Sequence, residues 1–207
     1  MTGALAFFGA FNPPTVAHIE LARFALEATG REKVIFVPSK SAYIRGEQGK
    51  DFAFSEAERC LMLRLAASTR PWMGICDWEI RQPRQMRTYD TLCHLRDTGV
   101  RAALLFGSDK LAELETAWLH VPEICREFGV VCLERGGDDC RSMIGNSPFL
   151  RALSPYITVL ATPEGTRHIS STAVREILSA GGDPAGMVPE EIWPILKKHR
   201  EEKGHEA

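Results

Sequence analysis

Residues 4–18 read ALAFFGAFNPPTVAH, and this stretch decides the fold class. The apolar run Ala4–Phe8 is typical of a buried β-strand, and helical periodicity follows over Val16–Ala28. Further apolar runs predict strands at 34–37, 73–79, 102–106, 130–133 and 157–160. Because helical patterns separate these uninterrupted runs, we predict an α/β fold with a doubly wound parallel sheet and helices on both faces.

The composition is that of a globular protein, with 207 residues, 44% hydrophobic and 25% charged. We expect a single domain over residues 1–207, with a small C-terminal helical part at about 168–203. The net charge of -2 lacks the basic excess of nucleic-acid binders. No apolar run approaches a membrane span of about 18 residues or more. We therefore expect neither nucleic acid nor a membrane as a partner.

Six cysteines lie at positions 60, 76, 93, 125, 132 and 140. Their spacing contains no C-x-x-C pair and no metal-binding pattern. We expect reduced, mostly buried thiols, no metal ligands in the protein, and a reducing cytoplasmic location.

The junction between the first strand and the first helix has the properties of a phosphate site. Gly9 lets the backbone approach a ligand, and two prolines stiffen the loop. Thr15 is placed to cap the helix, and His18 follows three residues later on the same face. Free N–H groups and the positive end of the helix dipole favour an anion there. The spacing alone supports equally a capping threonine beside a surface histidine.

A second donor-rich helix start lies near the C-terminus, where residues 168–175 read HISSTAVR. Three hydroxyl residues precede a helical run that ends at Gly181-Gly182, and Arg175 lies one turn into it. A guanidinium there is suited to a polyphosphate. The alternative is a helix cap without a ligand. Two such helix starts, each after a strand, favour a nucleotide site.

These two motifs, in this order, resemble the (H/T)-x-x-H and I-S-S-T-x-x-R signatures of the nucleotidyltransferase superfamily. The pattern Gly9-x-Phe11-Asn12-Pro13-x-Thr15-x-x-His18 resembles nicotinamide/nicotinate mononucleotide adenylyltransferases, particularly their eukaryotic-type branch. Further matching patches run through the chain: Ala42-Tyr43 with Arg45, Arg59, Asp77-Trp78-Glu79, Phe106-Gly107-Ser108-Asp109, Trp118, Phe128–Val131, Arg135–Asp138, Val188-Pro189 and Lys198-His199. The resemblance implies a Rossmann-like fold over nearly the whole chain.

The chain departs from the common bacterial form of the family at several positions. Asn12 and Thr15 stand where that form has Asp and His, and Ala17 stands where it has Gly. The superfamily accepts Thr at the first motif position. Ile44 beside Arg45 gives a thinner basic cluster in the 39–53 loop.

The resemblance implies direct in-line attack of a pyridine mononucleotide phosphate on the ATP α-phosphate, giving a dinucleotide and pyrophosphate. It implies catalytic roles for His18, Thr15 and Arg175. ATP contacts are expected from Gly9, Ala10, Phe11, Thr15, His18, Gly107, Asp109, Ser170, Ser171, Thr172 and Arg175. Acceptor contacts are expected from Arg45, Trp78, Glu79, Thr88, Trp118 and Arg135. Mg²⁺ is expected to arrive bound to the ATP phosphates.

Several alternatives stay open at this point. Trp78 and Trp118 could be packing residues, Glu79 a solvated charge, and Asp109 a helix cap. The same superfamily includes phosphopantetheine adenylyltransferases and cytidylyltransferases, and a non-catalytic nucleotide-binding homologue is a third hypothesis. The choice between nicotinate and nicotinamide mononucleotide is open. So is the oligomeric state, including a homo-oligomer.

Overall fold

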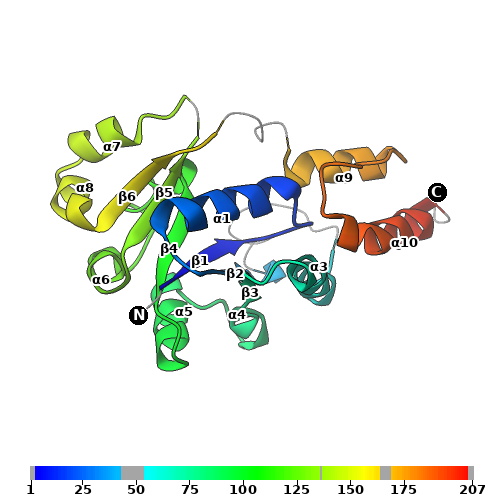
Figure 1. Cartoon of the computed structure of the whole chain (residues 1–207), viewed down its shortest axis with the longest axis horizontal. Coiled ribbons are helices and arrows are strands. Elements are labelled where there is room, and N and C mark those ends of the chain that lie inside the picture. Colours follow the sequence, from blue (N-terminus) through cyan, green and yellow to red (C-terminus); the bar gives the residue numbers. More distant parts are fainter. Residues whose placement is uncertain (1–2, 43–53, 136, 164–168, 205–207) are drawn as a thin grey trace. The chain divides into compact units, whose positions relative to one another are not determined.

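The computed structural model describes residues 3–42, 54–135, 137–163 and 169–204 (Figure 1). Six strands form one sheet: β1 (Ala4–Gly9), β2 (Lys33–Pro38), β3 (Met73–Ile75), β4 (Ala102–Gly107), β5 (Val130–Glu134) and β6 (Ile157–Ala161). Their order is β3-β2-β1-β4-β5-β6, and the β1–β4, β4–β5 and β5–β6 pairs are parallel. This is the strand order of a doubly wound, Rossmann-like sheet, so the predicted α/β fold class is confirmed.

The helices alternate with the strands along the chain. The α-helices are α1 (Val16–Thr29), α3 (Glu56–Ser68), α4 (Trp78–Arg81), α5 (Thr88–Asp97), α6 (Val121–Glu123), α7 (Cys140–Asn146), α8 (Pro148–Leu153), α9 (Ser171–Ser179) and α10 (Trp193–Gly204). Four further helical turns, of 3-10 or π type, are η1 (Ser108–Lys110), η2 (Ile124–Phe128), η3 (Ser154–Tyr156) and η4 (Glu190–Ile192).

Five of the six predicted strands agree with the structure to within one residue at each end. The predicted strand over 73–79 is wrong beyond Ile75, because Trp78 and Glu79 begin the helix α4. Asp77 leaves the extended conformation, with φ -93 and ψ 16. Its carboxylate accepts hydrogen bonds from Arg64 (2.6 Å) and Arg81 (2.8 Å). These two ion pairs favour the turn that ends the strand.

Local capping chemistry explains several of the helix ends. Ser55 and Glu58 form a capping box at the start of α3, with 2.7 Å between the Ser55 N–H and the Glu58 carboxylate. Gly30 follows α1 with a φ of 61, and Gly181 follows α9 with a φ of 74. Near the C-terminus, η4 leads directly into α10 at Trp193.

The chain forms two compact units. Unit 1 comprises residues 1–8, 21–35 and 86–164, and unit 2 comprises 9–20, 36–85 and 165–207. In unit 1, β4, β5 and β6 lie side by side, α5 packs against β4, and α7 packs against α8 (Figure 1). In unit 2, α3 packs against β3 and η4, and α9 contacts α10. The boundary runs through β1, α1 and β2, so three elements contribute residues to both units.

All six cysteines are free thiols, and four of them are buried, as predicted. Burial raises the pKa of Cys125 to about 11 and also raises that of Cys132, whose sulfur lies 3.8 Å from that of Cys140. These thiols therefore stay protonated at neutral pH. Over the described parts of the chain, every helix is too short or too polar to span a bilayer.

Candidate active site

Thr15 and His18 form a closed hydrogen-bonded pair at the start of α1. The Thr15 Oγ1 lies 2.7 Å from His18 Nδ1, and the Thr15 backbone N–H donates to the same nitrogen at 3.1 Å. The His18 N–H donates in turn to Thr15 Oγ1 at 3.4 Å, as a helix-capping threonine requires. Because Nδ1 accepts from an N–H group, the proton of a neutral imidazole lies on Nε2. Thr15 itself is fully buried, and its N–H and hydroxyl both contact the His18 ring.

Phe11 supports the other side of the imidazole. Its ring lies edge-on to His18, with 5.3 Å between centroids, and also contacts Phe36 at 5.3 Å. Phe11 has a φ of 46 and only 1% of its surface is exposed. A Cβ added to Gly9 would lie 3.0 Å from the Phe11 ring, so the glycine makes room for this packing. The sequence predicted Gly9 as a ligand contact, and the structure adds this packing reason for it.

The buried guanidinium of Arg59 holds the loop between β1 and α1. Its Nη1 donates to the carbonyl of Ala10 at 2.6 Å, and Nη2 donates to the carbonyl of Ser39 at 2.8 Å and to Ser41 Oγ at 3.2 Å. Burial lowers the pKa of Arg59, yet an arginine stays protonated at neutral pH. The loop that follows β1 therefore lies beside a permanent positive charge.

The second predicted motif meets the first within unit 2. The Ser171 hydroxyl donates to the carbonyl of Pro13 at 2.7 Å, and Arg175 Nη1 donates to the carbonyl of Asn12 at 2.8 Å. Ser170 Oγ caps α9 by accepting the Ala173 N–H at 3.1 Å. Two sequence motifs that lie far apart in the chain thus meet at the Asn12–Pro13 peptide.

The Arg175 side chain keeps capacity for a ligand after these contacts. Its Nη2 donates to Thr172 Oγ1 at 3.2 Å, in addition to the bond with Asn12. A guanidinium has five N–H donors, so two bonds use only part of that capacity. The structure therefore accommodates both readings of residues 170–175, the helix cap and the anion contact.

In unit 1, predicted nucleotide contacts gather where β4 and β5 end. A Cβ at Gly107 would lie 2.7 Å from Asp109 Oδ1 and 3.3 Å from Arg135 Nε. Ser108 Oγ donates to Asp138 at 2.5 Å and accepts the Arg135 N–H at 3.2 Å. Gly107, not Asp109, is the cap residue of η1, so the helix-cap alternative for Asp109 is wrong.

Two further predicted acceptor contacts also lie in unit 1. Trp118 is half-buried, and its ring lies 6.0 Å from that of Phe106. Thr88 is half-buried and is the first residue of α5. The packing alternative for Trp118 is supported in part, because one neighbour is the buried Phe106 at the end of β4.

The predicted contacts Trp78 and Glu79 lie on α4 in unit 2. Glu79 is 1% exposed and accepts a 2.6 Å hydrogen bond from Gln85 Nε2, so the solvated-charge alternative is wrong. The Gln85 side chain also accepts the Lys40 N–H at 3.2 Å. Trp78 is half-buried. Arg45 lies outside the described residues.

Sequence reasoning missed the supporting residues of both regions. Arg59 matched the family without receiving a role, and its signal was a charge on the helix side that also carries Met62 and Leu63. Tyr89 and His120, whose rings stack at 5.1 Å, gave no signal because their contact depends on tertiary structure. In the described ranges, no three His, Cys, Asp or Glu residues gather as a metal site would require.

Comparisons with known proteins agree with this arrangement. The model of the cytidylyltransferase-like family matches residues 6–177. A probable nicotinate-nucleotide adenylyltransferase of Caldicellulosiruptor bescii is 28% identical, over 93% of this chain and 94% of that protein. The nicotinamide/nicotinic acid mononucleotide adenylyltransferase of Arabidopsis thaliana is 26% identical, over 93% of this chain and 86% of that protein.

The structural comparison gives the same fold. The Plasmodium falciparum nicotinic acid mononucleotide adenylyltransferase, solved in complex with NaAD, superposes with a TM-score of 0.72 at 16% identity. The match covers 99% of this chain and 97% of that one. With the family model covering most of its length and both signature motifs meeting on one loop, the chain belongs to the cytidylyltransferase-like family.

Proposed function

We propose that this protein is an adenylyltransferase that joins ATP to nicotinate or nicotinamide mononucleotide, giving the dinucleotide and pyrophosphate. The observation that carries the proposal is the meeting of two donor-rich helix starts, α1 and α9, at Asn12 and Pro13. Such helix starts bind phosphates through free N–H groups and the helix dipole. Relatives that match 93% of this chain bear names with this activity, which supports the proposal.

The proposed reaction is a single in-line displacement. A phosphate oxygen of the mononucleotide forms a bond to the α-phosphorus of ATP, and the bond from that phosphorus to the oxygen bridging to the β-phosphate breaks. Pyrophosphate leaves with the electron pair. Such a reaction asks the protein for positioning and charge stabilisation, with no covalent intermediate.

The donors of unit 2 fit these demands. His18 donates from Nε2 to a phosphoryl oxygen whose negative charge grows in the transition state. Thr15 fixes that tautomer through the 3.1 Å bond from its N–H to Nδ1. Arg175, with Ser170 and Ser171, binds the β- and γ-phosphates that leave, while Arg59 holds the loop containing Gly9, Ala10 and Phe11.

Mg²⁺ is proposed to enter with ATP. The side chains of the loop and of the α9 start are hydrogen-bond donors and cations, and this donor set fits phosphate oxygens. A Mg²⁺ ion bound by those phosphates would neutralise part of their charge and keep several waters. The protein residues then have to bind and orient the complex.

A pyridine mononucleotide needs aromatic side chains for its ring and polar or charged side chains for its ribose and phosphate. We propose that the chain offers both kinds. The family resemblance assigns Trp78 and Trp118 to the acceptor, and an indole offers an aromatic face for an electron-poor ring. Glu79 and Thr88 offer hydrogen bonds, and Arg135 offers a charge for phosphate. Gly107 and Asp109 are proposed to contact the ATP nucleoside.

We also place the protein in a reducing cytoplasm, supported by its six free cysteines.

The test is pyrophosphate release from ATP and, separately, from CTP. Each is offered nicotinate mononucleotide, nicotinamide mononucleotide, phosphopantetheine and a phosphorylated alcohol. The proposal expects turnover with ATP and a pyridine mononucleotide, with the dinucleotide identified by mass spectrometry. Turnover only with another acceptor, or only with CTP, would contradict the choice of substrates. No release with any pair would support a non-catalytic homologue.

A further inference from the structure

His120 holds an unusual backbone conformation two residues after Trp118. Its φ is 60 and its ψ is 29, in the left-handed region that a residue with a Cβ rarely adopts. This turn directs the chain into α6, where the His120 carbonyl accepts the Ile124 N–H at 2.9 Å. The next residue, Val121, is buried. The conformation of His120 therefore sets the direction in which the segment that carries Trp118 enters α6.

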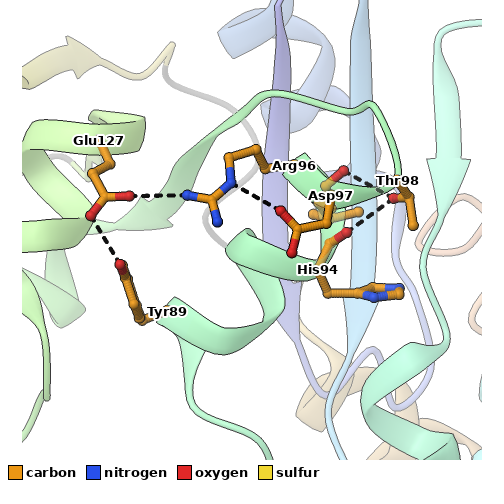
Figure 2. A network of polar contacts seen from close by, with 7 residues as sticks. Tyr89, His94, Arg96, Asp97, Thr98 and Glu127 are labelled. Carbon is orange, nitrogen blue, oxygen red and sulfur yellow. Dashed lines mark hydrogen bonds and ion pairs between the residues drawn. The ribbon is translucent and has the colours of Figure 1, made fainter.

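The His120 ring is held by Tyr89 of α5. The two rings stack with centroids 5.1 Å apart and planes at 28°. Tyr89 donates to the Glu127 carboxylate at 2.9 Å, and Arg96 donates to the same carboxylate at 3.1 Å (Figure 2). The edge of the Tyr89 ring also meets Phe128, at 6.1 Å between centroids. Tyr89 is thus held by two contacts outside the Trp118 segment, the hydrogen bond to Glu127 and the ring contact with Phe128.

The phenol group of Tyr89 stays protonated at neutral pH and so donates a hydrogen bond. Its hydrogen bond to Glu127 raises the pKa of Tyr89 to about 12. The bond to Glu127 and the stack on His120 use different parts of one side chain. They can therefore be removed separately by substitution.

The stack joins two segments that both carry proposed acceptor contacts. Tyr89 directly follows Thr88 at the start of α5, and His120 lies two residues beyond Trp118. We propose that Tyr89 and His120 are positioning residues for the acceptor: their stack fixes the Trp118 segment relative to the start of α5. Neither side chain needs to touch the substrate. This inference rests on the proposed function, because that function assigns Thr88 and Trp118 to the acceptor.

The test uses two substitutions that remove the stack and one control that keeps it. His120→Gly removes the ring while retaining a residue that adopts a left-handed φ without strain. Tyr89→Leu removes the partner ring. Tyr89→Phe keeps the ring on His120 and loses the hydroxyl with its bonds to Glu127 and Cys93. For each protein, KM for the mononucleotide, KM for ATP, kcat and the melting temperature are measured.

The proposal expects His120→Gly and Tyr89→Leu to raise KM for the mononucleotide by about three- to fivefold, the size of one aromatic contact. KM for ATP should stay within about twofold in both, and Tyr89→Phe should resemble the wild type. Unchanged KM values in folded His120→Gly and Tyr89→Leu proteins would overturn the proposal. So would an equal rise in both KM values, which indicates a general structural role.

The wild-type assay separates this inference from the proposed function. If the wild type uses an acceptor other than a pyridine mononucleotide, the proposed substrate is wrong, and the same KM comparison is made with the acceptor that it uses. If the wild type uses no acceptor at all, both proposals fail. Activity of the wild type together with unaltered variants refutes the positioning role alone.

Discussion

The loop before α1 and the segment before α6 each contain a strained backbone conformation, and they hold it by different contacts. Each contains a residue with a Cβ and a positive φ, Phe11 at 46 and His120 at 60. Phe11 is buried among Gly9, His18 and Phe36, whereas His120 is exposed and held by a stack on Tyr89. The first conformation is enforced by the core and the second by a contact at the surface.

This difference separates two tasks. The α1 loop is interlocked, because Asn12, Thr15 and Ala10 all use backbone atoms in bonds to Arg175, His18 and Arg59 respectively, so the imidazole is positioned before any ligand arrives. Preorganised donors are what a phosphoryl transfer requires. The Trp118 segment is instead held at the surface, where His120 stacks on Tyr89. We expect substitutions in the loop to alter folding and kcat, and substitutions in the segment to alter acceptor binding.

The largest expected effect is a difference in the free energy of unfolding between substitutions of the two positive-φ residues. Phe11→Gly keeps the backbone conformation accessible but removes a buried ring, and we expect a loss of about 3–5 kcal/mol in the free energy of unfolding. His120→Gly removes an exposed ring and should change that free energy by less than about 1 kcal/mol. Urea unfolding of both proteins checks this contrast. Equal losses would show that burial does not distinguish the two regions.

The next effect concerns the imidazole that the loop positions. His18→Ala removes the Nε2–H donor, and we expect kcat to fall by about 10²-fold or more with a small change in the melting temperature. Steady-state pyrophosphate release measures it. A kcat near that of the wild type would remove His18 from the mechanism.

A smaller effect should follow from loosening the imidazole without removing it. Thr15→Val loses the hydroxyl 2.7 Å from His18 Nδ1, and we expect kcat to fall by about tenfold, the worth of one hydrogen bond. Thr15→Ser keeps the hydroxyl and serves as the matched control, with a kcat within about threefold of the wild type. If the two variants are equally slow, Thr15 acts through packing and not through His18.

The smallest effect should be confined to the acceptor. Trp118→Ala removes the aromatic face, and we expect KM for the mononucleotide to rise about five- to tenfold while KM for ATP stays unchanged. Competition kinetics between the two pyridine mononucleotides would then measure base preference. A protein that unfolds, or one with both KM values raised, would support the packing interpretation of Trp118.

The sequence alone predicts the elements whose structure depends on residues close together in the chain. The capping chemistry of Ser55, Thr15 and Ser170 lies within three residues of each helix start, and the apolar runs locate five strands to within one residue. The end of β3 could not be predicted, because Asp77 is bound by Arg64 from another helix. The apolar pattern alone predicted a strand that continued past Ile75 and through Trp78.

The support of the site depends on contacts that sequence spacing does not encode. Arg59 reaches Ala10 across 49 positions of sequence, and the ring of Tyr89 meets that of His120 from a different element. The family resemblance supplied the residues that are proposed to contact substrates, without the residues that hold them in place. These supporting residues are the ones that the structure adds.

A structure with ATP bound tests the central claim most directly, since it shows whether the α1 and α9 starts bind one triphosphate. The account predicts His18 Nε2 and the Arg175 guanidinium within about 3 Å of oxygens of the same triphosphate, at ordinary hydrogen-bond distance. A triphosphate that contacts neither side chain would contradict it.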